Sequence, residues 1–484
     1  MRCHIPAARR GLLLCLVPFL WTLALGSWGL SRQDSVWRDE AATWQVACRP
    51  AGEIWRMLGN VDAVHGLYYL LMHGLFEVFG ASTTTLRLPS VLAVACASVC
   101  VAVIGRRLAG AWAGLGGALA LGLLPAVQFY LQEGRPYALV AAGAGLSTLL
   151  LVSLLADRPG RRTWPRWAAY GAAVLVCALL NWLSLLVLPA HAVTLAWVRA
   201  GRGVWLRWTA YGGGAVAGAL PLILFSRGQS DQVSWIPPLT WHMMIGPGIM
   251  LAVGALGAWA DRPDRSRLSA AAVGLPLLAV PQLGLVGLSL VQPLFLDRYV
   301  LFSMVGLALL IGAALGAGVR ACAPRFPSLS ALLVPGVATV SVLALLPVEL
   351  GKRAPASRVD DVLAVAGEVA RLKRDGDGVL FVPAARRDTA LVSPGAFSGL
   401  TDLALAATPV ASATLKGEEV PPVLIREALL GQRRVLLVTD AAKVAKAPSA
   451  ERDKVKTAVL RERFTAVEDR QLRGRRVTVY ERRD

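Results

Sequence analysis

The sequence predicts a polytopic α-helical membrane protein of about eleven transmembrane helices, followed by a small C-terminal extracytoplasmic α/β domain. Three observations support this prediction. Of the 484 residues, 55% are hydrophobic and 17% are charged, and the mean hydropathy is +0.55, whereas a soluble domain carries about 25% charged residues. Long apolar runs recur up to Leu350, and from Gly351 the composition changes abruptly.

A membrane-spanning helix needs about 20 largely apolar residues. Eleven runs meet or approach this length, and we expect a helix in each: 11–30, 87–104, 111–131, 136–156, 167–181, 184–198, 208–225, 243–260, 269–290, 299–320 and 331–350. The two short runs on either side of Asn181 are most simply explained as a hairpin of two helices. Residues 1–30 resemble a signal peptide but lack a convincing cleavage motif, so we expect an uncleaved first span.

The segment from His65 to Gly80 decides the predicted topology. It is apolar enough to enter the bilayer, but it has only 16 residues and contains His73 and Glu77. If it lies in or on the outer leaflet, the cytoplasmic loops hold 17 Arg, and the opposite side up to Leu350 holds eight. Because basic residues are in excess in cytoplasmic loops, we expect a cytoplasmic N-terminus and an extracytoplasmic C-terminal domain. The polar clusters then all fall on the outer face.

Charge and cysteine usage exclude other classes of protein. The net charge of +19 is typical of a membrane protein with Arg-rich cytoplasmic loops, which argues against nucleic-acid binding. The seven cysteines show no metal-ligand spacing, so we expect neither disulfides nor a zinc site. Arg outnumbers Lys by 43 to 7, a composition typical of a GC-rich bacterial gene.

The composition divides the chain into a membrane domain, residues 1–350, whose first outer loop is 31–86, and an extracytoplasmic domain, residues 351–484. Alternating strands and helices in the second predict a small α/β layer domain. The expected helices are 358–374, 417–431 and 449–463, and the expected strands are 378–382, 434–440 and 477–481. It contains no phosphate-binding loop or nucleophile elbow, so a structural or acceptor-presenting role is expected.

The strongest candidate for chemistry is the pair Asp39 and Glu40, in the loop after the first span. One carboxylate can take a proton from a hydroxyl nucleophile, while its neighbour positions that acceptor or a divalent ion. The alternative is an exposed acidic pair that offsets Arg32 and Arg38.

Three arginines on the outer face, Arg87, Arg135 and Arg298, each lie at the end of a different span. A guanidinium binds phosphate in a bidentate manner, so together they can hold a phosphate at headgroup depth. The alternative is that each anchors its helix by snorkelling to the interface. Five aromatic residues can stack on a sugar or form an interfacial belt: Trp37, Trp44, Tyr68, Tyr69 and Trp235.

The order of these motifs resembles the GT-C glycosyltransferases, and most closely the protein O-mannosyltransferases and aminoarabinose transferases of glycosyltransferase family 39 and its bacterial relatives. The resemblance covers residues 11 to about 350. It depends on Asp39-Glu40, on a D-x-x-H-x-x-x-Y segment with Asp62, His65 and Tyr69, on L-R-L-P-S at 86–90, on Q-E-x-R-P-Y-A at 132–138 and on Arg298-Tyr299.

This resemblance implies an inverting transfer of a mannose-like or arabinose-like sugar from a polyprenyl-phosphate donor to an envelope acceptor (a glycolipid, polysaccharide or protein) at a bacterial plasma membrane. It implies that Asp39 is the general base and Glu40 its partner, and that no metal is obligatory, although a divalent cation near this pair stays open. It also implies a set of substrate-binding residues: Asp62, His65, Tyr69, Arg87, Gln132, Glu133, Arg135, Tyr137, Arg298 and Tyr299.

Two other classes of function fit parts of the sequence. A transporter or flippase of a lipid-linked sugar needs ionisable or unwound positions near the middle of the membrane. The apolar runs contain almost none at their centres, which favours one-sided catalysis. A non-catalytic envelope scaffold is the other alternative, and the Asp39-Glu40 pair argues against it.

Overall fold

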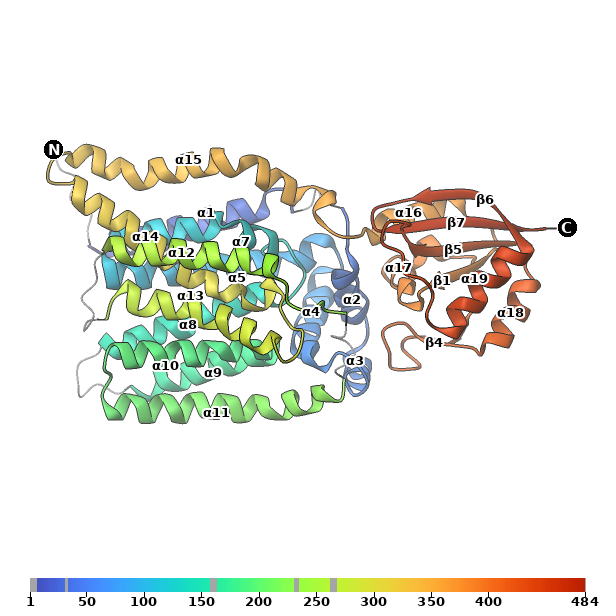
Figure 1. Ribbon diagram of the computed structural model, residues 1–484, viewed down its shortest axis with the longest axis horizontal. Coiled ribbons are helices and arrows are strands. Elements are labelled where there is room, and N and C mark those ends of the chain that lie inside the picture. The colour runs from blue at the N-terminus through green and yellow to red at the C-terminus, as the bar shows by residue number, and fades with distance from the viewer. Residues whose placement is uncertain (1–6, 31–33, 157–162, 230–234, 262–267, 484) are drawn as a thin grey trace. The chain divides into compact units, whose positions relative to one another are not determined.

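The structure, a computed structural model, describes residues 7–30, 34–156, 163–229, 235–261 and 268–483 (Figure 1). The chain forms two compact units. The first, which we call the membrane unit, comprises Met1–Leu30 and Arg87–Leu350. The second comprises Ser31–Leu86 and Gly351–Asp484, and we call it the loop–tail unit. The first outer loop, which the sequence analysis grouped with the membrane domain, thus packs with the C-terminal domain.

The described part of the membrane unit is helical. Its α-helices are α1 (Ala7–Ser27), α5 (Thr83–Ala109), α6 (Ala111–Leu123), α7 (Pro125–Tyr130), α8 (Tyr137–Ala156), α9 (Trp164–Leu180), α10 (Val187–Trp197), α11 (Arg202–Arg227), α12 (Ile245–Asp261), α13 (Ala270–Ser289), α14 (Met304–Cys322) and α15 (Pro327–Arg353). Short 3-10 helices are η2 (Trp182–Leu186), η4 (Trp241–Met244) and η5 (Asp297–Ser303).

An apolar helix coincides with each of the eleven predicted runs, and the prediction of a polytopic helical membrane protein is confirmed. Among the described residues, seven helices are long and apolar enough to cross a membrane: Thr83–Ala109, Tyr137–Ala156, Arg202–Arg227, Trp241–Asp261, Ala270–Ser289, Asp297–Cys322 and Pro327–Arg353. Four shorter apolar helices accompany them: Gly11–Ser27, Ala111–Leu123, Trp164–Leu180 and Trp182–Trp197. The predicted cytoplasmic loops 157–166 and 261–268 lie largely outside the described residues.

Two local features divide the predicted runs. The expected hairpin turns at Asn181, which ends α9 in an extended conformation and whose side-chain Oδ1 accepts a hydrogen bond from the N–H of Leu183 at 3.1 Å. The prediction of one helix over 111–131 was wrong, because Leu124 is extended and α7 begins at Pro125. A residue before proline is pushed out of the helical region by contact with the proline ring.

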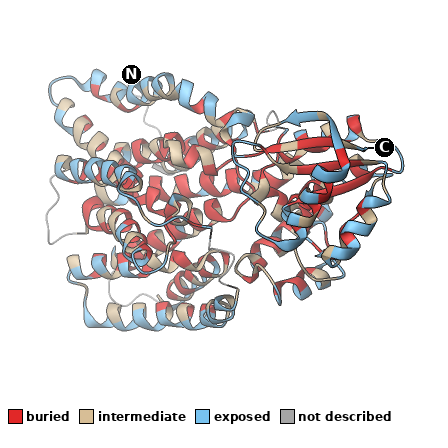
Figure 2. Ribbon diagram, turned by 45° about the vertical axis from the view of Figure 1, so that its right-hand side comes forward, coloured by how far each residue is buried: buried red, intermediate tan, exposed pale blue. Residues whose placement is uncertain are grey.

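Helix α14 packs against α6, α12 and α13. Figure 2 shows that the inner helices of this unit are largely buried and that its outer helices are largely exposed. In the most apolar 18-residue stretch of the span that contains α14, 78% of the residues are buried, compared with 11% in α15 and 17% in α11. Small residues permit the close approach of α6 to α14, since a Cβ atom added at Gly117 would lie 2.6 Å from the carbonyl oxygen of Ala308. The exposed apolar side chains of α11 and α15 are those expected of lipid-facing helices.

The loop–tail unit begins with α2 (Arg38–Ala47), α3 (Ala51–Leu58), the 3-10 turn η1 (Ala63–His65) and α4 (Gly66–Phe79). The segment from His65 to Gly80, on which the predicted topology depends, forms α4. Its 14 residues span only about 21 Å at 1.5 Å per residue. One face of α4 packs on α2 and α3, with the ring centroids of Trp44 and Phe76 5.6 Å apart. Its other face leaves Leu67, Leu71 and Val78 exposed. The location of α4 in or on the outer leaflet stays a prediction.

The C-terminal part of this unit is the α/β domain that the sequence predicted. Its helices are α16 (Val362–Leu372), α17 (Asp388–Val392), α18 (Pro422–Leu430) and α19 (Glu451–Arg463). Its strands are β1 (Gly378–Val382), β2 (Thr401–Asp402), β3 (Leu405–Ala407), β4 (Glu418–Glu419), β5 (Arg434–Asp440), β6 (Phe464–Gln471) and β7 (Arg475–Arg482). Remaining 3-10 turns are η6 (Pro355–Ser357), η7 (Ala384–Arg387) and η8 (Pro394–Phe397).

The main sheet has the order β2-β1-β5-β7-β6, in which β1 pairs in parallel with β2 and β5, and β7 pairs antiparallel with β5 and β6. Alternate side chains bury two apolar cores, one beneath α16 and one beneath α18 and α19. The edge strand β6 was not predicted. After Phe464 its side chains are exposed or half-buried, so its sequence lacks the apolar alternation that marks a strand.

Candidate functional site

The residues predicted for chemistry fall into two groups, one in each unit. The loop–tail unit contains Asp39, Glu40, Asp62, His65 and Tyr69. The membrane unit contains Arg87, Gln132, Glu133, Arg135, Tyr137, Arg298 and Tyr299. The first group lies within the single stretch 39–69, whereas the second is formed by three segments that are distant in sequence.

Asp39 and Glu40 occupy the first turn of α2, which begins at Arg38 after an extended Trp37. Carboxylates are stabilised at this end of a helix because the backbone N–H groups there carry partial positive charge. Asp39 is half-buried, whereas Glu40 is fully buried. The pair therefore consists of one carboxylate that a solvent-borne hydroxyl can reach and one that is enclosed by protein, which differs from the alternative of an exposed acidic pair.

The start of α2 is attached to the C-terminal domain. The backbone N–H of Val362 donates to the carbonyl oxygen of Val36 at 2.7 Å. Asp360 Oδ1 accepts a hydrogen bond from the backbone N–H of Arg38 at 3.0 Å, and its Oδ2 lies 3.3 Å from the Nε of the same arginine. Residues 322 positions apart in the sequence thus hold the helix that carries Asp39 and Glu40.

A buried arginine completes this attachment. Arg475 is fully buried and contacts Asp360 at 3.0 Å and Asp388 at 2.5 Å, and it also donates to the hydroxyl of Thr389 at 2.6 Å. Burial by itself lowers the pKa of Arg475, but the charges of Asp388 and Asp360 outweigh it and raise that pKa above the ordinary value. The guanidinium therefore stays charged, and Asp360 links it to the backbone of α2.

Asp62, His65 and Tyr69 are brought together at the turn that leads into α4. Asp62 has a positive φ of 62°, a conformation that Asp adopts more readily than most residues. The hydroxyl of Tyr69 donates to Asp62 Oδ2, and the ring centroids of His65 and Tyr69 lie 5.9 Å apart. His73 lies on α4, and its Nδ1 is 3.0 Å from the carbonyl oxygen of Ala47.

In the membrane unit, Ser90 on α5 joins the two segments that carry Arg87 and Arg135. Its hydroxyl donates to the carbonyl oxygen of Glu133 at 2.7 Å and lies 3.4 Å from that of Arg135. Arg87 is one helical turn before Ser90 and is fully buried, and Arg135 is only 7% exposed. A snorkelling arginine keeps its guanidinium in water, so this burial argues against the interfacial-anchor alternative for both residues.

Gln132 and Arg298 contact further segments of the same unit. The side-chain amide of Gln132 donates to the carbonyl oxygens of Gly26 and Trp28, both at 2.8 Å. The guanidinium of Arg298 lies 5.7 Å from the ring centroid of Tyr137 and 5.8 Å from those of Trp235 and Tyr299. Aromatic rings attract a guanidinium placed over their faces, so these rings restrict the position of the Arg298 side chain.

Some residues of these clusters were not predicted as site residues. The hydroxyl of Tyr130 donates to Asp297 Oδ1 at 2.7 Å, and the same oxygen accepts from the backbone N–H of Arg298 at 2.8 Å. Asp297 is adjacent in sequence to Arg298, which was a predicted site residue, and this position could have identified Asp297 as a further site residue. Nothing in the sequence identified Asp360 or Arg475, because both lie in the C-terminal domain, where no site residue was predicted.

The aromatic residues expected to stack on a sugar differ in accessibility. Tyr68 and Tyr69 are fully buried, whereas Trp235 is 58% exposed. Within the part of the chain that the structure describes, no three or more His, Cys, Asp or Glu side chains gather in a way that could hold a metal ion.

Comparisons with known proteins identify the class of fold. No family model matches the chain, and no curated protein matches it. Solved structures do match, and they show that the chain has the fold of the GT-C glycosyltransferases, as its sequence motifs suggested.

The chain is similar to ArnT, an aminoarabinose transferase, from Cupriavidus metallidurans, with 15% identity over 98% of both chains and a TM-score of 0.63 in the apo state. The same protein bound to undecaprenyl phosphate gives a TM-score of 0.60. The oligosaccharyltransferase AglB of Archaeoglobus fulgidus, in complex with an inhibitory peptide and a dolichol-phosphate, is 12% identical over 89% of this chain and 69% of its own, with a TM-score of 0.51.

Removing the buried arginine of the α2 attachment should destabilise the protein. Arg475→Met leaves Asp360 and Asp388 without their buried partner, a change that costs about 3–5 kcal/mol. The adjacent Arg476 is a matched control, because its ion pair with Asp469 is about one-third exposed on both sides, and such pairs contribute about 0–1 kcal/mol. We expect a clearly lower thermal unfolding midpoint for Arg475→Met than for Arg476→Met in detergent; equal midpoints would contradict this account.

Proposed function

We propose that the protein transfers a mannose-like or arabinose-like sugar from a polyprenyl-phosphate donor to an acceptor in the cell envelope, with inversion at the anomeric carbon. The acceptor is a glycolipid, a polysaccharide or a protein. The observation that carries the proposal is the fold shared with ArnT over 98% of both chains, together with the binding of undecaprenyl phosphate by that protein.

The reaction needs a base for the acceptor. The acceptor oxygen attacks the anomeric carbon, the bond from that carbon to the phosphate oxygen breaks, and the hydroxyl proton goes to a carboxylate. Asp39 is assigned this role because it is the accessible member of the pair in the first turn of α2. The buried Glu40 positions the acceptor beside it. No metal is needed for these steps.

The leaving group needs positive charge. A donor phosphodiester becomes a more negative phosphate monoester as the glycosidic bond breaks, so fixed cations stabilise the departing charge more than the starting one. The cluster of Arg87, Arg135 and Arg298 supplies them, supported by the tyrosines that surround Arg298. A prenyl chain enters between the apolar helices of the membrane unit.

The proposed location is a bacterial plasma membrane, with the N-terminus in the cytoplasm and the C-terminal domain outside. The excess of Arg in the loops assigned to the cytoplasm supports this orientation.

Loss of the general base should slow sugar transfer. With radiolabelled polyprenyl-phosphate mannose or arabinose and isolated envelope as acceptor, Asp39→Asn is expected to lower turnover by about 10²- to 10⁴-fold, and Glu40→Gln by less. The parental protein should transfer label equally well with and without a chelator. Full activity of Asp39→Ala would rule out the assigned role, and absence of transfer by the parental protein from both donors would reject the proposed function.

Arg135 and Arg298 can be tested with substitutions that keep their charge. Lysine loses the bidentate geometry, and a hydrogen bond to a charged group is worth about 1.5–3 kcal/mol. Arg135→Lys and Arg298→Lys should therefore lower turnover roughly tenfold or more in the same assay. Arg227→Lys is the control, because Arg227 is exposed in the last turn of α11. Parental rates in both variants would identify these arginines as interfacial anchors.

The orientation can be tested with reporters fused to the C-terminus. A periplasmic phosphatase should be active there, and a fluorescent protein that matures only in the cytoplasm should be dark. The reverse pattern would show that 65–80 crosses the membrane.

A further inference from the structure

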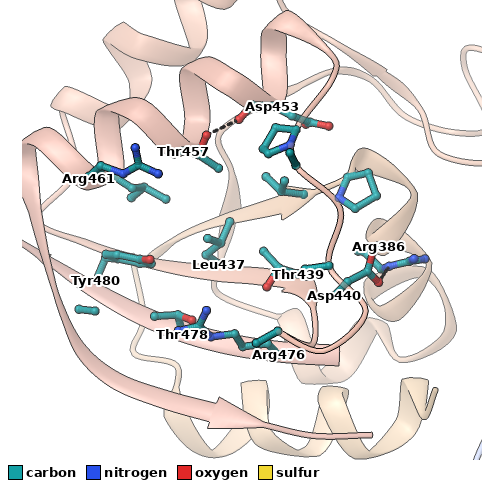
Figure 3. Close-up of a pocket in the computed structure, with 18 of the residues that line it drawn as sticks. Arg386, Leu437, Thr439, Asp440, Asp453, Thr457, Arg461, Arg476, Thr478 and Tyr480 are labelled. Atoms are coloured by element: carbon teal, nitrogen blue, oxygen red, sulfur yellow. Dashed lines mark hydrogen bonds and ion pairs between the residues drawn. The ribbon is translucent and has the colours of Figure 1, made fainter. Parts of the chain in front are cut away.

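The α/β domain contains a cavity of about 960 Å³ that the proposed transfer does not use. Figure 3 shows it between one face of the main sheet and helix α19. The loop that connects β5 to α19 forms one wall, through residues 442 and 444–449. Both the sheet and the helix belong to the loop–tail unit, so the cavity is formed within one compact body.

The topology of the sheet explains why a cavity forms here. The parallel strands β1 and β5 end side by side at Val382 and Asp440, and both residues line the cavity. In open α/β sheets, ligands bind beyond the carboxyl ends of parallel strands, where the connections diverge. The next strand along the chain, β6, is antiparallel to β7, as β5 is, and therefore runs in the same direction as β5. The connection after β5 must therefore return over the sheet, which it does as α19.

The lining of the cavity is strongly basic. Its ionisable side chains are Arg38, Arg386, Lys446, Arg461, Arg476 and Arg483, with Asp440 and Asp453. Both acids are already paired, Asp440 with Arg386 at 2.5 Å and Asp453 with the buried Lys456 at 2.9 Å. The described residues offer no ion-pair partner to Lys446 or Arg461, so these cations are available to an anion.

Hydroxyl groups and an aromatic ring lie among these cations. Thr439, Thr457 and Thr478 face the cavity together with the ring of Tyr480 (Figure 3). The floor between them is apolar and includes Leu437. The hydroxyls of Thr457 and Thr478 donate to Asp453 and Asp469 and can still accept hydrogen bonds, and a threonine hydroxyl such as that of Thr439 can both donate and accept. An amphipathic ring can pack against the face of a sugar, so this lining matches a saccharide better than an inorganic ion alone.

We propose that this cavity binds an anionic oligosaccharide, one that carries carboxylate or phosphate groups. Arg461 on α19 and Lys446 on the connecting loop bind the anionic groups, and the threonines and Tyr480 contact the sugar hydroxyls. Arg38, the residue before Asp39, also lines the cavity and connects it to the start of α2. Binding at this place does not depend on the proposed transfer, because it needs neither the donor nor Asp39.

The test measures binding by the full-length protein in nanodiscs of zwitterionic lipid, without donor, by isothermal titration calorimetry. The probes are tetragalacturonate, a phosphorylated maltotetraose, the neutral maltotetraose and inorganic phosphate. We expect one of the two anionic sugars to bind at least tenfold more tightly than maltotetraose and inorganic phosphate. Equal binding of the charged and neutral sugars, or of sugar and inorganic phosphate, would overturn the proposal, as would no binding of either anionic sugar.

Charge-reversal variants locate the site. Arg461→Glu combined with Lys446→Glu should weaken binding of the anionic sugar at least tenfold and leave the thermal unfolding midpoint unchanged. The matched control combines Arg463→Glu with Lys443→Glu, which changes net charge equally at exposed positions of the same helix and loop that do not line the cavity. Equal weakening by the two pairs would show nonspecific attraction to a basic domain and reject the site. Thr439→Val should weaken binding without any change in charge.

Discussion

The architecture of the loop–tail unit depends on how one buried carboxylate is neutralised. Asp360 is fully enclosed, and an isolated buried charge is too costly to persist. It is satisfied from two directions, by the guanidinium of Arg475 and by the backbone N–H and side chain of Arg38. The same atoms that neutralise Asp360 therefore determine where helix α2 begins. Because Asp39 and Glu40 form the first turn of that helix, the C-terminal domain positions the carboxylates proposed for catalysis.

Charge in the membrane unit is distributed differently. Its helices carry almost no ionisable groups at their centres. The segments 130–137 and 297–299, which do carry ionisable groups, are joined by the hydrogen bond from Tyr130 to Asp297, and Ser90 on α5 is hydrogen-bonded to the first of them. Arg87 and Arg135 are both buried, so protein packing holds their side chains in place. In the proposed function, a lipid phosphate that binds to side chains already held in place avoids the cost of ordering flexible ones. The aromatic residues around Arg298 contribute in the same way by limiting its conformations.

The C-terminal domain thus has two separate properties. Its α16 side and the Arg475 network hold the first outer loop, whereas the opposite face of the sheet forms a basic cavity beneath α19. The two share Arg38, whose backbone and guanidinium contact Asp360 and whose side chain lines the cavity. A domain that both positions the helix proposed for catalysis and binds an anionic glycan, as proposed, would couple the two through this one residue.

The sequence by itself determined the features that depend on local pattern. Apolar runs of membrane length predicted a helix at each of eleven places, Asn181 marked the hairpin, and alternating periodicities predicted an α/β tail. The motifs around Asp39, Asp62 and Arg135 were recognisable because each is contiguous. Tertiary structure decided which distant groups meet. Among 50 cations and 31 acids, no local rule selects Arg475 and Arg38 as partners of Asp360, or joins Tyr130 to Asp297 across 167 positions. Those pairs are selected by burial, which makes an unpaired charge costly only once the chain has folded around it.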